Sequence, residues 1–121
     1  MGHIEATKEL TAGPEAVWST VADPQWDAVI GDHLKGHLAV LKHAAEYLKA
    51  QSKAGAHPNA AVINTASGFG VPLPNARQAN YGSAEAAIAA LTLIAAEELD
   101  RYGVQVNAIA PIARIADRFP R

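Results

Sequence analysis

Residues 59–99 read NAAVINTASGFGVPLPNARQANYGSAEAAIAALTLIAAEEL, and this stretch decides the fold. It begins at residues 60–63 with a short apolar run containing β-branched side chains, which is typical of a strand buried in a parallel sheet. A loop rich in serine, glycine and proline follows, and a tyrosine then opens a long alanine-rich segment. We expect the loop to bring Ser67 and Tyr81 within reach of each other.

The alanine-rich segment, residues 83–99, carries one apolar stripe at helical spacing. Its members follow one another at intervals of four, three, four and four residues: Ala84, Ile88, Leu91, Ala95 and Leu99. This pattern predicts a helix that buries one face. The strand, the loop and the helix therefore form one packed unit.

Further helix and strand patterns flank this unit. Residues 26–51 predict a long helix, with apolar side chains at helical spacing: Ile30, Leu34, Leu38, Leu41, Ala45 and Leu48. After the second helix Gly103 predicts a helix end, and residues 104–110 alternate between apolar and polar as a strand does. Helices and strands that alternate with short connections predict an α/β fold with parallel strands.

Composition excludes several classes of function. The chain has 121 residues, of which 50% are hydrophobic and 18% are charged, so it is a globular domain and not a disordered segment. A formal charge of −2 gives no electrostatic reason to bind nucleic acid or an anionic membrane. Without cysteine, the chain has no disulfide, no catalytic thiolate and no cysteine-ligated zinc. No apolar run is long enough to span a bilayer and no leader pattern is evident, so we expect a cytoplasmic protein.

The start of the chain differs in character from the rest. Residues 1–23 predict a half-buried strand and then a helix with Pro14 near its start. The sequence PEAVWSTVADP within it resembles the opening of the START-like polyketide cyclase and lipid-binding superfamily. We therefore predict a segment of different origin at 1–23 and a second unit at 24–121. This resemblance implies hydrophobic-ligand binding as one alternative function.

Three motifs carry a second and longer resemblance. They are INTASG at 63–68, QANYGSAEAAIAALT at 78–92 and RYGVQVNAIAP at 101–111. In this order and spacing they resemble the C-terminal half of the short-chain dehydrogenase/reductase family, over about residues 26–114. The resemblance implies a partial Rossmann-like fold without the first βαβ half that binds the nucleotide, and NAD or NADP as the cofactor.

The resemblance also implies catalytic roles. Ser67 matches the serine that polarises the substrate carbonyl or hydroxyl, and Tyr81 matches the general acid/base. Glu85 stands where the family has a lysine, and His33 stands where it has an asparagine that supports a proton relay. After the last strand, the family's cofactor-binding segment falls at Pro111 and Arg114.

Glu85 is the departure with the largest chemical consequence. A tyrosine in water has a pKa near 10, so base catalysis near neutral pH needs a neighbouring positive charge. An anion in place of a cation at roughly 6 Å disfavours a phenolate by on the order of 5 kcal/mol at an effective dielectric of about 20. The sequence therefore predicts a truncated dehydrogenase-like protein that is not catalytically competent alone.

Two further expectations concern partners and metals. In the family that the chain resembles, the helices at 27–51 and 83–99 commonly form the subunit interface, so the resemblance implies a homo-oligomer. Their broad apolar faces are consistent with that role and equally with covering the sheet. The alternative function is an NAD(P)-dependent oxidoreductase that acts on a hydroxyl or carbonyl substrate through Ser67 and Tyr81. His33 and His37 are four residues apart, but no third ligand is evident. We predict no metal site and expect both histidines to face solvent.

Overall fold

The computed structural model describes residues 23–70 and 72–112. In chain order it contains α2 (Pro24–Val29), a π-helical turn (Ile30–Lys35, here the π-turn), α3 (Gly36–Lys53), β1 (Ala60–Thr65), α4 (Ala79–Leu99), a 3₁₀ turn (Asp100–Tyr102) and β2 (Val104–Ile109). The predicted strand and helix before Asp23, and the resemblance they carry, lie outside the described residues. The domain boundary at residue 23 stays a prediction.

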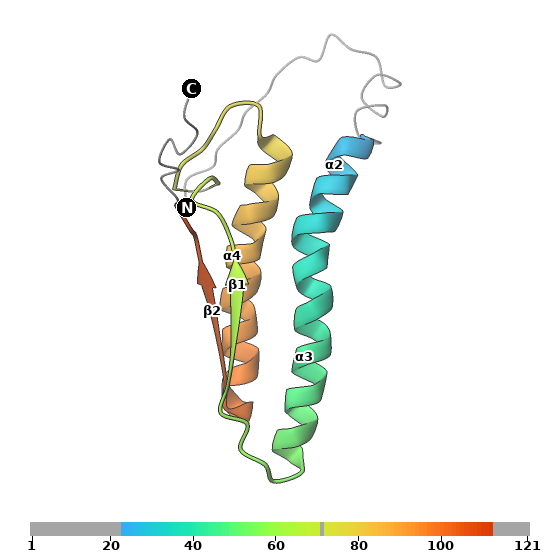
Figure 1. Ribbon diagram of the computed structural model, residues 1–121, viewed down its shortest axis with the longest axis vertical. Coiled ribbons are helices and arrows are strands. Elements are labelled where there is room, and N and C mark those ends of the chain that lie inside the picture. Colours follow the sequence, from blue (N-terminus) through green and yellow to red (C-terminus); the bar gives the residue numbers. More distant parts are fainter. Residues whose placement is uncertain (1–22, 71, 113–121) are drawn as a thin grey trace, which may run out of the picture.

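The two strands form a parallel sheet, which confirms the predicted α/β fold class (Figure 1). The register runs from Ala60 opposite Val104 to Thr65 opposite Ile109. Helix α4 makes the connection between the two strands. Strand β1 continues two residues beyond the predicted end at residue 63, because the ladder with β2 extends to Thr65.

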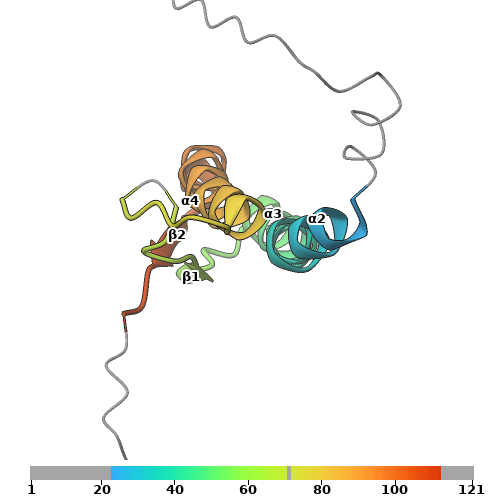
Figure 2. The same ribbon diagram turned by 90° about the horizontal axis from the view of Figure 1, so that it is seen from above.

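Helices α3 and α4 lie on the same side of the sheet (Figure 2). Five buried apolar residues fill the space between helices and strands: Leu41, Ala95, Leu99, Val104 and Val106. The predicted apolar stripe of α4 is confirmed, since Ala84, Ile88, Ala95 and Leu99 are all buried. Burial of this face, more than the helix propensity of alanine, is expected to stabilise the unit.

The long helix predicted for residues 26–51 extends in the structure from Pro24 to Lys53, but it is not one regular α-helix. The Asp23 side chain caps its start by accepting hydrogen bonds from the backbone N–H groups of Gln25 and Trp26. The π-turn interrupts it between α2 and α3. A π-turn admits one extra residue without ending the helix, so the apolar spacing alone did not predict it.

Helix α4 begins at Ala79, four residues before the predicted start at residue 83. A buried polar pair fastens it to β1. The Asn64 side-chain amide donates to the Thr92 hydroxyl at 2.9 Å, and that hydroxyl donates to the backbone carbonyl of Ile88 at 2.8 Å. Within the described part of the chain, no helix has both the length and the apolar character needed to cross a bilayer.

Candidate functional site

Three of the predicted site residues meet where the π-turn packs against α4. Tyr81 and Glu85 lie one turn apart on α4, so they share a face of that helix. Nδ1 of His33, in the π-turn, lies 2.8 Å from Oε1 of Glu85. The His33 ring also meets the Tyr81 ring edge-on, with centroids 5.3 Å apart and an angle of 87°. The structure thus joins positions 52 residues apart in the sequence.

Glu85 is buried at this site. Its side chain is only 5% exposed, whereas the His33 side chain is half-buried. An ionised carboxylate only accepts hydrogen bonds, so Nδ1 of His33 is the donor. A buried charge is costly unless it is paired and hydrogen-bonded, and His33 supplies that partner. The carboxylate is therefore fixed beside Tyr81 and does not extend into solvent.

The expectation that His33 and His37 face solvent is wrong. Both are half-buried, and each uses its Nδ1 in a hydrogen bond. The His37 ring donates to the backbone carbonyl of His33, within the π-turn, while His33 donates to Glu85. Among residues 23–70 and 72–112, no three histidine or acidic side chains are grouped so that they could hold a metal ion.

Ser67 lies on the loop after β1. Its hydroxyl oxygen accepts a hydrogen bond from the backbone N–H of Phe69 at 3.1 Å. It lines a cavity of about 230 Å³ with Pro111, and the rest of the lining is Gly68, Phe69, Leu73 and Ile112. The described hydrogen bonds include none between Ser67 and Tyr81. Arg114 lies outside the described residues.

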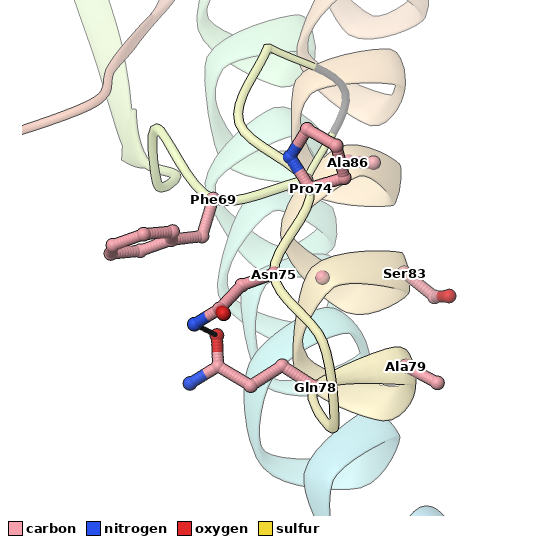
Figure 3. A pocket seen from close by; sticks show the side chains of 9 residues that line it. Phe69, Pro74, Asn75, Gln78, Ala79, Ser83 and Ala86 are labelled. Carbon is pink, nitrogen blue, oxygen red and sulfur yellow. Dashed lines mark hydrogen bonds between the residues drawn. The ribbon is translucent and has the colours of Figure 1, made fainter.

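A second hollow lies between this loop and the first turns of α4 (Figure 3). It has a volume of about 310 Å³, and Asn75 donates a 3.1 Å hydrogen bond to Gln78 beside it. Small residues of α4 form its floor: Ala79, Gly82, Ser83 and Ala86. At 100° per residue these positions face away from Tyr81 and Glu85. The sequence did not predict this hollow. The small residues at the start of α4 are the only feature of the sequence that indicates it.

The family follows from comparison with known proteins. The family profile described as short chain dehydrogenase matches residues 11–115. The chain belongs to this family, as predicted. The profile match begins inside the segment 1–23 and so includes part of it.

The chain is similar to several relatives over only part of their length. The chain is 46% identical over 98 residues to the hydroxyacyl-CoA dehydrogenase ChsB1 of Mycobacterium tuberculosis, covering 79% of this chain and 31% of that protein. It is 35% identical to the mouse (3R)-3-hydroxyacyl-CoA dehydrogenase, covering 75% of this chain and 33% of that protein. A crystal structure of a short chain dehydrogenase from Mycobacterium avium matches with a TM-score of 0.70 and 49% identity, covering 77% of this chain and 32% of that one. The chain thus spans about a third of the length of these relatives.

Proposed function

We propose that this chain is a short-chain dehydrogenase segment that does not catalyse hydride transfer alone and that associates with a second copy of itself. The observation that supports it is the environment of Glu85. The acid/base role that family resemblance assigns to Tyr81 needs a cation one turn further along α4, where the chain carries a buried carboxylate. Any charge on His33 is matched by Glu85, so the pair supplies no net positive charge to Tyr81.

The described residues also do not fit a dinucleotide. Members of this family generally use NAD(P), whose pyrophosphate is held by cations or by backbone N–H groups at a helix start. The cavity beside Ser67 and Pro111 contains no charged side chain in its lining. The charged side chain beside Tyr81 on α4 is an anion, Glu85, already bonded to His33.

Calorimetric titration of the chain with NADH and NADPH tests the catalytic part of the proposal. We expect no binding at micromolar concentration. The variant Glu85→Lys is expected to remain inactive in an NAD(P)H absorbance assay, because it restores a cation beside Tyr81 but adds no site for the pyrophosphate. Micromolar binding by the unmodified chain, or turnover by the variant, would contradict the proposal.

A groove between α3 and α4 supports self-association. It has a volume of about 340 Å³, and its floor is formed by buried or half-buried apolar residues: Leu41, Ala45, Leu91, Ala95 and Leu99. Ile94 on its wall is 58% exposed. Lysines and glutamates line it too, namely Lys42, Lys49, Glu46 and Glu98. Because the groove carries charges of both signs, two copies can meet here without an excess of like charge.

Replacing Ile94 by glutamate is expected to dissociate the dimer. A charge on the wall of the groove, desolvated when the second copy binds, should weaken association by roughly 100-fold, which corresponds to about 3 kcal/mol. Sedimentation velocity across a concentration series measures the change. Leu93→Glu is the matched control, because Leu93 is also largely exposed but lies about 100° further round α4. Equal association of both variants and the unmodified chain would contradict this interface.

The alternative function is an NAD(P)-dependent oxidoreductase acting on a hydroxyl or carbonyl substrate through Ser67 and Tyr81. The similarity to the hydroxyacyl-CoA dehydrogenase ChsB1 favours it. The same titration separates the two functions, since the alternative requires cofactor binding. Under the alternative, Tyr81→Phe should abolish a turnover that the unmodified chain possesses.

A further inference from the structure

A cavity lies at the end of the fold where both strands begin, between the loop before β1 and the 3₁₀ turn before β2 (Figure 1). It has a volume of about 380 Å³. Ser67 follows the opposite end of β1, and a strand of six residues spans roughly 20 Å. Glu85 lies in the second turn of α4, whereas the cavity follows the last turn of that helix. The cavity is therefore separate from the residues that the family resemblance selects.

The fixed charges around this cavity are positive. Its lining contains the guanidinium of Arg101 and the imidazole of His57 but no carboxylate. Lys49 adds an ammonium group nearby, with Nζ over the Tyr102 ring at 5.6 Å from its centroid. Within residues 23–70 and 72–112, the ion pairs involve neither Arg101 nor Lys49. Two permanent cations therefore adjoin the cavity without an acidic partner in the described part of the chain.

Tyr102 fixes the position of the Arg101 guanidinium. The guanidinium carbon lies over the Tyr102 ring, 4.9 Å from its centroid, which is within cation–π distance. The ring itself is half-buried and packs against the hydrophobic core. An arginine held over a ring loses less side-chain freedom when it binds a ligand, and its N–H groups remain available for two parallel hydrogen bonds to one anion.

Neutral hydrogen-bonding groups also line the cavity. The Ser52 hydroxyl comes from the last turn of α3, and the Asn59 amide comes from the loop just before β1. The described hydrogen bonds include none made by either side chain. A hydroxyl and an amide can each donate to an oxygen atom. The lining thus combines a positioned cation with free donors, which is the chemistry that recognises an oxyanion.

We propose that this cavity binds a phosphoryl group, either of free phosphate or of a small phosphate monoester. A dianion is matched by Arg101 and Lys49 together, whereas a carboxylate carries only one charge. The cavity has more than ten times the roughly 30 Å³ that one water molecule occupies, so a phosphoryl group can enter with several further atoms. The site goes beyond the proposed function and depends neither on Glu85 nor on a nicotinamide cofactor.

Amide NMR spectra of the full chain, titrated in a phosphate-free buffer, test the proposal. The probes are inorganic phosphate and glycerol 3-phosphate, with sodium chloride at matched ionic strength as the reference. We expect both probes to shift the amides of residues 52, 57 and 101–103, with a Kd of about 1 mM. Tighter binding of the monoester would assign the site to a small organic phosphate, and equal or tighter binding of inorganic phosphate would assign it to the free ion. Such an affinity is far weaker than micromolar, so this result is distinguishable from the dinucleotide titration.

Three variants locate the contact. Arg101→Gln is expected to weaken binding by about tenfold, because it removes the charge and the paired donors. Arg101 is exposed, so the variant should fold normally. Arg101→Lys keeps the charge but loses the planar fork, and we expect a loss of about threefold. Lys35→Gln is the matched control, because it removes an exposed cation about 25 Å away at the other end of α3.

Three results would overturn the proposal. The first is the absence of a saturable shift with either probe up to about 20 mM, which is well above the expected Kd. The second is an equal shift with sodium chloride, which would show a general effect of salt. The third is an equal loss of binding in Arg101→Gln and Lys35→Gln, which would show attraction by the net charge of the chain and no localised site.

Discussion

Replacing His33 by alanine is expected to lower the free energy of unfolding by about 2–3 kcal/mol. The substitution removes the hydrogen bond to Glu85 and leaves a carboxylate that is 5% exposed without its partner. The penalty is the cost of an unpaired buried charge, which exceeds the value of the bond itself. Urea denaturation followed by circular dichroism measures the change.

Two controls distinguish the loss of the buried His33–Glu85 pair from the general effect of replacing a histidine by alanine. His43 forms a comparable pair with Glu46 at 3.8 Å, but both side chains are exposed, so His43→Ala should cost less than about 0.5 kcal/mol. The double variant His33→Ala with Glu85→Leu should recover most of the loss, because no buried charge remains. A loss for His33→Ala no larger than that for His43→Ala would show that the pair contributes little.

Replacing Ile88 by alanine is expected to cost about 3 kcal/mol. Ile88 is fully buried with 0% exposure, at the centre of the apolar face of α4. Removing its side-chain atoms leaves a cavity that the neighbouring helix turns cannot fill. Thermal unfolding and urea titration should both report the loss, and Leu93→Ala is the control because Leu93 is 70% exposed. A small loss for Ile88→Ala would mean that α4 does not pack against the sheet as described.

The sequence predicted the helices and strands because each is marked by apolar periodicity. The stripe ending at Leu99 and the alternation after Gly103 are local patterns. Burial follows the stripe, but along β2 it follows the alternation only at Val104 and Val106, since Ala108 is exposed. The start of α4 was less predictable. No side chain caps the helix at Gln78, so the usual N-terminal signal was missing.

The contacts of the candidate site were harder to predict than its residues. Resemblance to the family selected His33, Tyr81 and Glu85 one by one, but their contact depends on two elements that meet only in the folded chain. Burial of Glu85 was not expected, since a carboxylate on a helix normally faces solvent. The burial of Glu85 is possible because the π-turn places His33 within hydrogen-bond distance of its carboxylate. No periodicity in the sequence indicates such a turn.

The π-turn at residues 30–35 also sets the rotation of α2 about the helix axis relative to α3. Each residue of an α-helix advances the chain by about 100° around its axis, so one residue removed from this turn would rotate all of α2 by that angle relative to Leu41. His33 lies after Gly31 and is continuous with α3, so a deletion at Gly31 would rotate α2 while His33 and α3 keep their places. A single deletion at Gly31 would therefore change the face that α2 presents to α4, and it would leave the packing of α3 and the contact between His33 and Glu85 in place.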